Sequence, residues 1–326
     1  MLKSFLVTGG TGFLGAALVR RLVETGNHVR ILDDNSRGSP RRLADIADDF
    51  ELIQGDVRDP ATVIAAARGR DAFLHLAAVN GTEFFYLKPE LVLDVGVRGI
   101  LNAVEACRKC DVGQLVVASS SEVYQTPPKV PTDETVPLVV PDVLNPRYSY
   151  GGSKIISELI AINAGRTGFD RVNVFRPHNV YGPDMGWEHV IPQFCLRAIE
   201  QIALHPAGRL PFALQGDGSQ TRSFTHIDDM IDGLVLIVEK GAHNEIYHVG
   251  NPEELEIGKV ARAVIAEFGR EAELVPSSLP EGSTARRCPD ISKVEALGFA
   301  PKVPFRQGIA PVVKWYRDHV HLRRAV

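Results

Sequence analysis

The sequence has few cysteines, and none of them suggests a metal or disulfide framework. Four cysteines in 326 residues are too few for a disulfide framework that would stabilise a chain of this size. Cys107 and Cys110 form a CxxC pair, but they fall in a stretch with helical spacing. No second Cys or His pair matches them, so reduced helix thiols are favoured over a zinc or redox site. We therefore predict no metal site.

The sequence also lacks a strong charge excess and a long apolar run. A net charge of −4 argues against nucleic acid or an anionic membrane surface as the main partner. No apolar run approaches the length of a membrane span. The first residues, MLKSFLVTGGTGFLG, lack a signal-peptide pattern because their short apolar run leads directly into glycines. We expect a cytoplasmic protein with no nucleic-acid or membrane partner.

Short runs rich in Val, Ile and Leu alternate with amphipathic segments, of which 14–25 and 90–109 have helical spacing. Continuous apolar strands that alternate with helices indicate a parallel sheet covered on both faces. We therefore predict an α/β fold. The predicted strands are SFLVTG, HVRILDD, FELIQGD, DAFLHLAA, QLVVASSS, RVNVFRP and EIYHVG.

The composition changes after about residue 180. Pro and Gly become frequent there, and the strand–helix alternation is interrupted. We predict a main domain over 1–180, whose sheet is completed by part of 222–250. The region 181–326 is predicted to be mainly a smaller, substrate-facing part.

A glycine-rich turn separates the first predicted strand from the first helix. In TGGTGFLG, Gly9 permits a tight turn, Gly12 lets the backbone approach a pyrophosphate, and Gly15 allows close helix–strand packing. The helix N-terminus supplies positive potential for phosphates. The glycine spacing alone is weak evidence, but the position of this turn between a strand and a helix predicts a dinucleotide site.

The second predicted strand ends in two acidic residues, Asp33 and Asp34. A carboxylate about 20 residues beyond the glycines can bind the adenosine ribose hydroxyls and would repel a 2′-phosphate, which favours NAD over NADP. Arg37 and Arg41 lie nearby and leave that choice open. The alternative interpretation of the two acidic residues is a solvated strand end.

Tyr150 and Lys154 lie one helical turn apart, so their side chains emerge on one helix face. A phenol has a reference pKa of about 10, and a lysine cation or a positive nicotinamide ring would favour the phenolate. Tyr150 could then accept a proton from a substrate hydroxyl, while Lys154 holds the nicotinamide ribose. We expect Gly151, Gly152 and Ser153 to leave room for cofactor and substrate. The alternative is an exposed pair on a surface helix.

Several motifs together resemble the extended short-chain dehydrogenase/reductase family, and more narrowly its NAD-dependent nucleotide-sugar epimerases, dehydratases and decarboxylases. The motifs span nearly the whole chain. They are TGGTGFLG, the DD after the second strand, GDVRD (55–59), HLAA (75–78), SSSEVY (119–124), YGGSK (150–154), RPHNVYGP (176–183), GDGSQTRSFTHIDD (216–229), YHVGN (247–251) and RRCPDISKVEALGFAP (286–301).

The resemblance implies a Rossmann-like doubly wound parallel sheet with a smaller C-terminal substrate-binding domain. It implies tightly held NAD that is recycled within each turnover, and a nucleotide diphosphate sugar as substrate. It also implies a homodimer in which segments 90–109 and 151–166 pair into a four-helix interface. Two rivals remain: a non-catalytic NAD-binding relative, and a simple alcohol dehydrogenase that releases NADH.

The resemblance also assigns site residues. Its cofactor set is Gly9, Gly12, Phe13, Leu14, Gly15, Asp33, Asp34, Asp56, Val57, Leu76, Ala77, Ala78, Ser119, Tyr150, Lys154 and Pro177. Its substrate set is Ser121, Asn179, Val190, Gln215, Arg222 and Arg287. Arginine guanidinium groups suit a diphosphate, although an ion pair with Asp228 or Asp229 is an alternative role for Arg222.

The motif SSSEVY bears on the reaction. By resemblance, Ser120 hydrogen-bonds the same substrate oxygen as Tyr150. Glu122 would remove the C5 proton in a dehydratase, orient the carboxylate in a UDP-glucuronate decarboxylase, or have no proton to move in a 4-epimerase. A structural carboxylate is the remaining alternative. We predict an epimerase or dehydratase that acts through a 4-keto intermediate, with the decarboxylase as the alternative.

Three features depart from the family pattern. Gly96 occupies a position where members commonly have Asn, so a cofactor-side hydrogen bond is expected to be missing or replaced. Gln125 follows VY where Gly is usual. Segment 184–194 is distinctive, and core packing is an equally good explanation for its tryptophan. Its candidates for sugar specificity are Trp187, Glu188 and His189.

Overall fold

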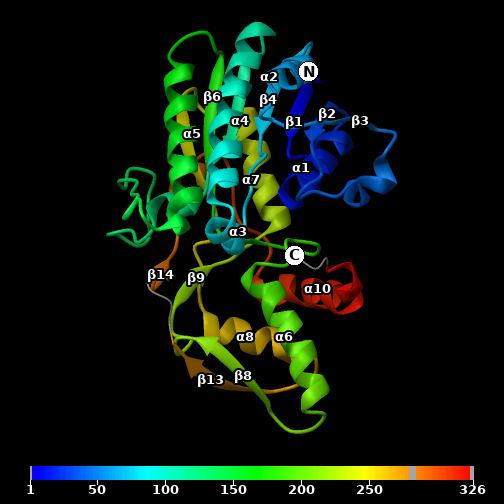
Figure 1. Cartoon of the computed structure of the whole chain (residues 1–326), viewed down its shortest axis with the longest axis vertical. Coiled ribbons are helices and arrows are strands. Elements are labelled where there is room, and N and C mark those ends of the chain that lie inside the picture. Colours follow the sequence, from blue (N-terminus) through cyan, green and yellow to red (C-terminus); the bar gives the residue numbers. More distant parts are fainter. Residues whose placement is uncertain (1, 279–283, 324–326) are drawn as a thin grey trace.

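The computed structural model describes residues 2–278 and 284–323. Its centre is a seven-stranded parallel sheet in the order β3-β2-β1-β4-β5-β6-β11 (Figure 1). The strand order reverses between β1 and β4, which makes the sheet doubly wound and confirms the predicted fold class. The strands are β1 (Ser4–Thr8), β2 (His28–Asp33), β3 (Phe50–Gln54), β4 (Ala72–His75), β5 (Gln114–Ala118), β6 (Arg171–Pro177) and β11 (Glu245–Val249).

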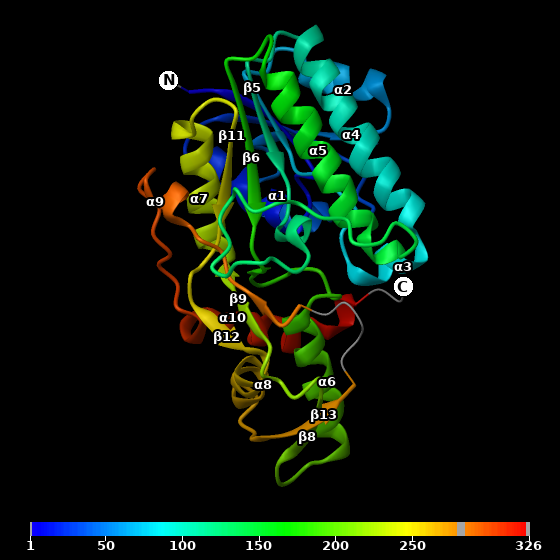
Figure 2. The ribbon, with the colours of Figure 1, turned by 90° about the vertical axis from the view of Figure 1, so that its left-hand side faces the viewer.

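Helices cover both faces of this sheet (Figure 2). On one face lie α1 (Phe13–Glu24) and α7 (Ile227–Lys240), and on the other α2 (Pro60–Ala67), α4 (Pro89–Lys109) and α5 (Ser149–Gly165). Because side chains alternate along a strand, Phe5 and Val7 pack toward α1 and α7, whereas Leu6 packs toward the other layer. The apolar residues of β1, β4 and β5 are therefore all buried, as the continuous apolar runs predicted, whereas Leu52 in the edge strand β3 is exposed.

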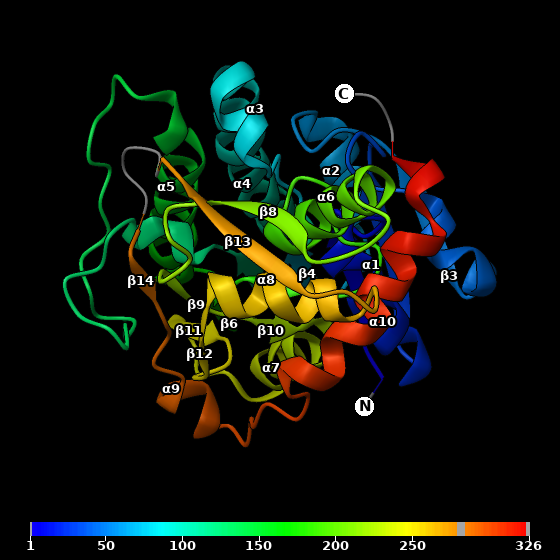
Figure 3. The same cartoon turned by 90° about the horizontal axis from the view of Figure 1, so that it is seen from below.

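A smaller lobe lies below the sheet and has its own apolar core (Figures 1 and 3). The chain enters it after β6 and returns to the main sheet for α7 and β11. In it α6 (Val190–Leu204) and α8 (Ile257–Ala266) pack against one face of the parallel pair β8 (Leu210–Gln215) and β13 (Ala272–Ser277), and α10 (Phe305–Asp318) packs against these two helices.

Short elements join the two parts. β7 (Val180–Tyr181) pairs with β10 (Thr225–His226), and β9 (Thr221–Ser223) lies between β12 (Glu254–Glu256) and β14 (Arg286–Arg287). The other helices are α3 (Thr82–Leu87) and α9 (Ser292–Glu295), with 3₁₀ turns at Pro40–Ile46, Ser121–Tyr124, Pro146–Tyr148 and Val320–Leu322. No helix within the described ranges is long and apolar enough to cross a membrane.

Gly96 lets α4 approach α5 closely. A Cβ atom at this position would lie 2.8 Å from the Cβ and Oγ atoms of Ser153. Ser157 on α5 donates a hydrogen bond to the Gly96 carbonyl at 3.3 Å. The departure at residue 96 therefore serves the contact between the two helices.

We predict that Gly96→Ala lowers the free energy of unfolding by about 1–2 kcal/mol, because the new methyl group overpacks the α4–α5 contact. Gly152→Ala on α5 is the matched control. A Cβ there would meet only Val140, at an ordinary 3.7 Å. Because alanine has a higher helix propensity than glycine, this control should raise the free energy of unfolding by up to about 1 kcal/mol. Urea denaturation of both variants measures the difference. Equal effects of the two substitutions would contradict this account of Gly96.

Candidate active site

A cavity of about 400 Å³ opens at the carboxyl ends of the parallel strands, next to the point where the strand order reverses. Every residue of the predicted cofactor set lines it, together with Ser120, Ser121, Glu122 and Asn179. The remaining predicted substrate residues, Val190, Gln215, Arg222 and Arg287, do not line it. Lining residues outside the predicted sets include Ser36, Arg37, Arg42, Asn80, Gly186 and His189.

The glycine turn has the shape that a dinucleotide pyrophosphate requires. Gly9 has a φ of +73°, a conformation that favours glycine. A Cβ at Gly15 would lie 2.0 Å from the Gly9 carbonyl oxygen, so only glycine lets α1 pack against the turn. The N-terminus of α1 faces the cavity through Phe13 and Leu14. Backbone amides and the helix end can therefore bind phosphate here.

Asp33 ends β2 and fixes the glycine turn. Its carboxylate accepts hydrogen bonds from the backbone N–H groups of Thr11 and Asn35, both at 2.9 Å. A carboxylate has further lone pairs, so Asp33 can still accept from ribose hydroxyls. The neighbouring Asp34 accepts from the backbone N–H and the hydroxyl of Ser36. Asp33 thus holds the turn and also faces the cavity.

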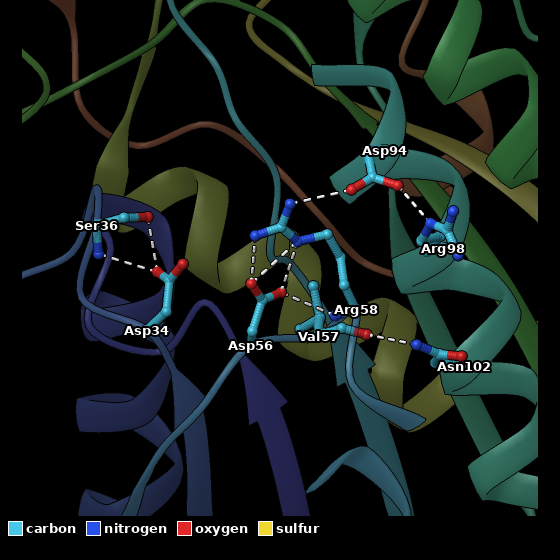
Figure 4. A network of polar contacts seen from close by, with 8 residues as sticks. All are labelled: Asp34, Ser36, Asp56, Val57, Arg58, Asp94, Arg98 and Asn102. Atoms are coloured by element: carbon cyan, nitrogen blue, oxygen red, sulfur yellow. Dashed lines mark hydrogen bonds and ion pairs between the residues drawn. The ribbon is translucent and has the colours of Figure 1, made fainter. Parts of the chain in front are cut away.

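An ion-pair network rims the cavity near Asp56 and Val57, which belong to the predicted cofactor set (Figure 4). Arg58 pairs with Asp56 at 2.5 Å and with Asp94 on α4 at 3.0 Å. The hydrogen bond from Arg58 holds the pKa of the Asp56 carboxyl below its usual value. Asn102 donates to the Val57 carbonyl at 2.8 Å. The loop after β3 is therefore fixed to α4 beside the cavity.

Tyr150 and Lys154 are both buried in the first turns of α5. Lys154 Nζ lies 5.7 Å from the Tyr150 ring centre and donates to the Ala118 carbonyl at 2.8 Å. Burial lowers the pKa of Lys154 to about 8, against the opposing effect of Glu158. Burial raises the pKa of Tyr150 to about 12, although a hydrogen bond with Ser120 acts in the opposite direction. The sequence predicted that the Lys154 cation would favour the phenolate, but in the structure burial dominates and the pKa of the phenol is raised.

The glycines between Tyr150 and Lys154 do not make room for the ligand. A Cβ at Gly151 would lie 2.7 Å from Gln125 Nε2 and 3.0 Å from the Glu122 carbonyl oxygen. Neither Gly151 nor Gly152 lines the cavity. The prediction for these glycines was wrong, because Gly151 is needed for the close contact of α5 with the 3₁₀ turn Ser121–Tyr124.

Sequence reasoning missed Glu158, one helical turn beyond Lys154. Its carboxylate pairs with Arg176 on β6 at 2.5 Å, and both side chains are almost fully buried. It also accepts a hydrogen bond from Ser119, which precedes Ser120. Its spacing, four residues after Lys154, places Glu158 on the same helix face and could have drawn attention to it. Its partner Arg176, however, lies 18 residues further along on β6, where spacing gives no sign of the pair.

Glu122 is bound by a guanidinium group. Its Oε1 atom lies 2.5 Å from Nη1 of Arg287 on β14. Burial raises the pKa of the Glu122 carboxyl, but Arg287, with Arg147 and Arg222, lowers it by more, so the pKa lies below its ordinary value. Glu122 is therefore a carboxylate within a cluster of three arginines.

Arg222 makes no ion pair with either predicted acidic partner. Its guanidinium donates to the carbonyls of Thr221 and Thr284, each at 2.7 Å. Asp228 pairs instead with His226, and Asp229 accepts from the backbone of 302–303. Burial, with repulsion from the other arginines, lowers the pKa of Arg222 to about 10. Among the described residues Arg222 makes no ion pair, and a half-buried cation of this kind suits an anionic ligand.

Two further departures from the family pattern have local explanations. Gln125 has a φ of +53°, which glycine would adopt at less cost, and its Nε2 donates to the Glu122 carbonyl at 2.6 Å. In segment 184–194, Trp187 packs against Trp315 and Tyr316. Trp187 is therefore a packing residue, whereas His189 lines the cavity.

The cysteines are free thiols. Burial raises the pKa of Cys107, which lies on the buried face of α4. Cys110 donates to the Ile64 carbonyl at 3.4 Å. Within 2–278 and 284–323, no group of three or more His, Cys, Asp or Glu residues could hold a metal ion.

This cavity, with a glycine turn at one end and a buried Ser–Tyr–Lys set at the other, defines a dinucleotide-dependent enzyme of the Rossmann type. Residues 5–250 match the family described as "NAD dependent epimerase/dehydratase family". The chain belongs to this family, and NAD is its cofactor.

Relatives of known activity cover nearly the whole chain. The chain is 33% identical to a dTDP-4-dehydro-6-deoxy-D-allose reductase of Streptomyces bikiniensis, over 97% of each chain. It is 30% identical to UDP-glucuronic acid decarboxylase 1 of Arabidopsis thaliana, over 97% of this chain and 70% of that protein. These relatives perform different reactions, so identity alone does not choose among them.

A solved structure agrees with the fold throughout. The dTDP-glucose 4,6-dehydratase of Streptomyces venezuelae, with NAD bound, superposes with a TM-score of 0.86 at 29% identity, over 98% of each chain. A UDP-glucose 4-epimerase of Thermus thermophilus, also with NAD, gives a TM-score of 0.83 at 27% identity, over 97% of this chain and 99% of that one. The chain is an enzyme of this nucleotide-sugar group.

His75 ends β4 beneath the cavity and is buried. Its Nδ1 atom lies 2.9 Å from Thr8 Oγ1. Burial, with a smaller effect of the Lys154 charge, lowers the pKa of His75 from 6.5 to about 3. The folded protein therefore keeps this imidazole neutral where the unfolded chain binds a proton.

We predict that His75 makes the free energy of unfolding fall as pH decreases from about 6.5 toward 3. In that window the unfolded state binds one more proton than the native state, which contributes a slope of about 1.4 kcal/mol per pH unit. His75→Gln should reduce the slope by about that amount. Denaturant titrations at several pH values measure it, and an unchanged slope in the variant would refute the neutral, buried imidazole.

Proposed function

We propose that the chain oxidises the C4 hydroxyl of a nucleotide diphosphate sugar to a 4-keto intermediate and recycles NAD within each turnover. The observation that carries this proposal is one cavity that holds the glycine turn, Asp33 and the Ser120–Tyr150–Lys154 set. A non-catalytic NAD-binding protein has no need for that buried set.

The roles of the residues follow from their chemistry. Tyr150 accepts the proton of the C4 hydroxyl, and Ser120 hydrogen-bonds the same oxygen. Lys154, held by the Ala118 carbonyl, binds the nicotinamide ribose. Bound NAD accepts and returns a hydride, and the positive charge of its oxidised ring favours the Tyr150 phenolate.

We propose that the region 181–326, with Asn179 at its border, binds the nucleotide diphosphate part of the substrate. Arg287, which is buried, and Arg222, which is half-buried, are the proposed donors for the phosphates. Asn179 has a φ of +36°, and its amide donates to the Ser223 carbonyl at 2.8 Å. Val190 begins α6 and Gln215 ends β8 in the smaller lobe, where we place contacts to the nucleotide. The S. venezuelae relative is a dTDP-glucose 4,6-dehydratase, so its substrate is a nucleotide sugar, which supports this assignment.

Glu122 directs the fate of the 4-keto intermediate in this proposal. In a dehydratase it removes the acidified C5 proton, and in a 4-epimerase it moves no proton. Decarboxylation of a hexuronate is a second candidate, because Glu122 is already held by Arg287 among three arginines. The excess positive charge there suits a substrate carboxylate in addition to the diphosphate.

We predict that Tyr150→Phe lowers turnover about 10²–10⁴-fold while nucleotide-sugar binding survives, because the ring remains but the proton acceptor is lost. Turnover is measured with a panel of UDP-, GDP-, dTDP- and CDP-sugars, and products are identified by mass. Tyr86→Phe, on an exposed ring, is the control and should be silent. Full activity in Tyr150→Phe would refute the proposed mechanism.

We predict that Glu122→Gln separates the candidate reactions. A dehydratase should stall after C4 oxidation, because the C5 proton can no longer be removed. A 4-epimerase should lose only modest activity, and a decarboxylase should fall between these two. The product mass provides an independent check, since dehydration removes water, decarboxylation removes carbon dioxide and epimerisation changes nothing. Steady release of NADH with a sugar alcohol would instead favour a simple dehydrogenase.

We also propose that the protein is a cytoplasmic homodimer in which α4 and α5 of two copies pair. Both helices carry exposed apolar side chains, namely Leu93, Leu101, Ile156 and Leu159. Such side chains on two adjacent helices can bury against a second copy. A monomeric mass in light scattering at micromolar concentration would exclude the dimer.

A further inference from the structure

Segment 184–189, between β7 and α6, is tied to the cofactor domain by ion pairs. Asp184 Oδ2 lies 2.6 Å from Nη2 of Arg41, and the Asp184 carbonyl accepts from Arg42 at 3.0 Å. Arg42 also donates to the carbonyl of Thr11 in the glycine turn at 3.1 Å. The beginning of the segment is thus connected to the turn that is shaped for the pyrophosphate.

Near its other end, Glu188 pairs with Arg37 on the loop after β2. The carboxylate accepts hydrogen bonds from both Nη atoms of Arg37, at 3.1 and 3.2 Å. Arg37 Nη2 also donates to the Asn80 carbonyl at 2.8 Å, and its guanidinium lies 4.3 Å from the Phe84 ring centre. Arg37 therefore joins three segments: its own loop, the loop after β4 and segment 184–189.

The opposite side of segment 184–189 is held by apolar packing. Trp187 packs against Trp315 and Tyr316 of α10, and Tyr316 donates to the Met185 carbonyl at 2.6 Å. The segment is thus packed on α10 of the smaller lobe. Its ties to the cofactor domain described above are polar, and polar ties can open without exposing a core.

All three segments joined by Arg37 line the cofactor cavity. Ser36, Arg37 and Gly38 line it from the first, Asn80, Gly81 and Thr82 from the second, and Gly186 and His189 from the third. We propose that the Arg37–Glu188 pair is a clasp that retains NAD in this cavity between turnovers. The proposal rests on the proposed function, because only a recycled cofactor has to remain bound.

The donors of Arg37 support a clasp rather than a phosphate site. Both of its Nη atoms are already engaged by Glu188 and Asn80. Burial raises the pKa of the Glu188 carboxyl, but the hydrogen bond and the charge of Arg37, with smaller local effects, together lower it by more, so Glu188 stays ionised at neutral pH. Both side chains are partly buried, at 28% and 18% exposure, so the pair is less screened than a surface ion pair.

The rate of NAD release from the holoenzyme, without sugar, tests the clasp. The protein is loaded with NAD that is radiolabelled in its adenine and then chased with excess unlabelled NAD. Retained label is counted after rapid gel filtration. Glu188→Gln keeps the side-chain shape but removes the charge, and we expect release about tenfold faster, because loss of one partner of a partly buried pair acts mainly on dissociation.

Glu51→Gln is the matched control. Glu51 pairs with Arg30 at 2.6 Å, and Arg30 also donates to a backbone carbonyl, but neither residue lines the cavity. This variant should release NAD at the unchanged rate. If Glu188→Gln does not fold, Arg37→Gln breaks the same pair from its other side.

Release rates in Glu188→Gln or Arg37→Gln equal to that of Glu51→Gln would overturn the clasp. Release that is faster in the double variant than in either single variant would show that the two residues act independently, and would also overturn it. Because no sugar is present, failure of the clasp is distinct from failure of the proposed function. The latter would appear as absence of product from an enzyme that retains its NAD.

Discussion

Three charged side chains that are buried near Ser120, the proposed catalytic serine, constrain the rest of the structure. Glu158 on α5 pairs with Arg176 on β6, and Lys154 on the same helix binds the carbonyl at the end of β5. A buried charge that loses its partner costs about 3–5 kcal/mol, so this arrangement fixes the helix against two strands. Tyr150 lies on this helix, and Ser120 follows the end of β5 by two residues. The position of Tyr150 relative to Ser120 therefore depends on the pairing of these buried charges.

The cavity depends on two parts of the chain with different kinds of contact. The parallel sheet contributes the glycine turn and the carboxyl ends of its strands, where backbone amides and Asp33 face one ligand. The region 181–326 contributes Arg222 and Arg287 near Glu122 and the segment that reaches Arg37, whereas Arg147 precedes α5. Apolar cores hold each part together, whereas several contacts across the cavity are ion pairs. This division suits an enzyme that exchanges its sugar each turnover and keeps its cofactor.

The sheet and the cofactor lining could be predicted from sequence, because both depend on local patterns. Seven apolar runs became the seven strands, and short motifs placed after strands converge at one sheet edge. The ion pairs could not be predicted, since Arg37 and Glu188 are 151 residues apart and Glu122 and Arg287 are 165 apart. The role of Gly151 was also misjudged, and the packing role of Gly96 was not predicted. The neighbours that require Gly96 and Gly151, Ser153 and Gln125, lie on other elements, and spacing along the chain gives no sign of them.

The most direct test of the account follows deuterium from C4 of a nucleotide sugar. Holoenzyme is mixed with the substrate labelled at C4, and both the bound cofactor and the product are analysed by mass spectrometry at successive times. A recycled cofactor predicts deuterium on enzyme-bound NADH at early times and full deuterium in the final product, whichever of the three reactions occurs. Product without the label, together with deuterated NADH free in solution, would contradict the central claim. Turnover during which no label ever reaches the cofactor would contradict it equally.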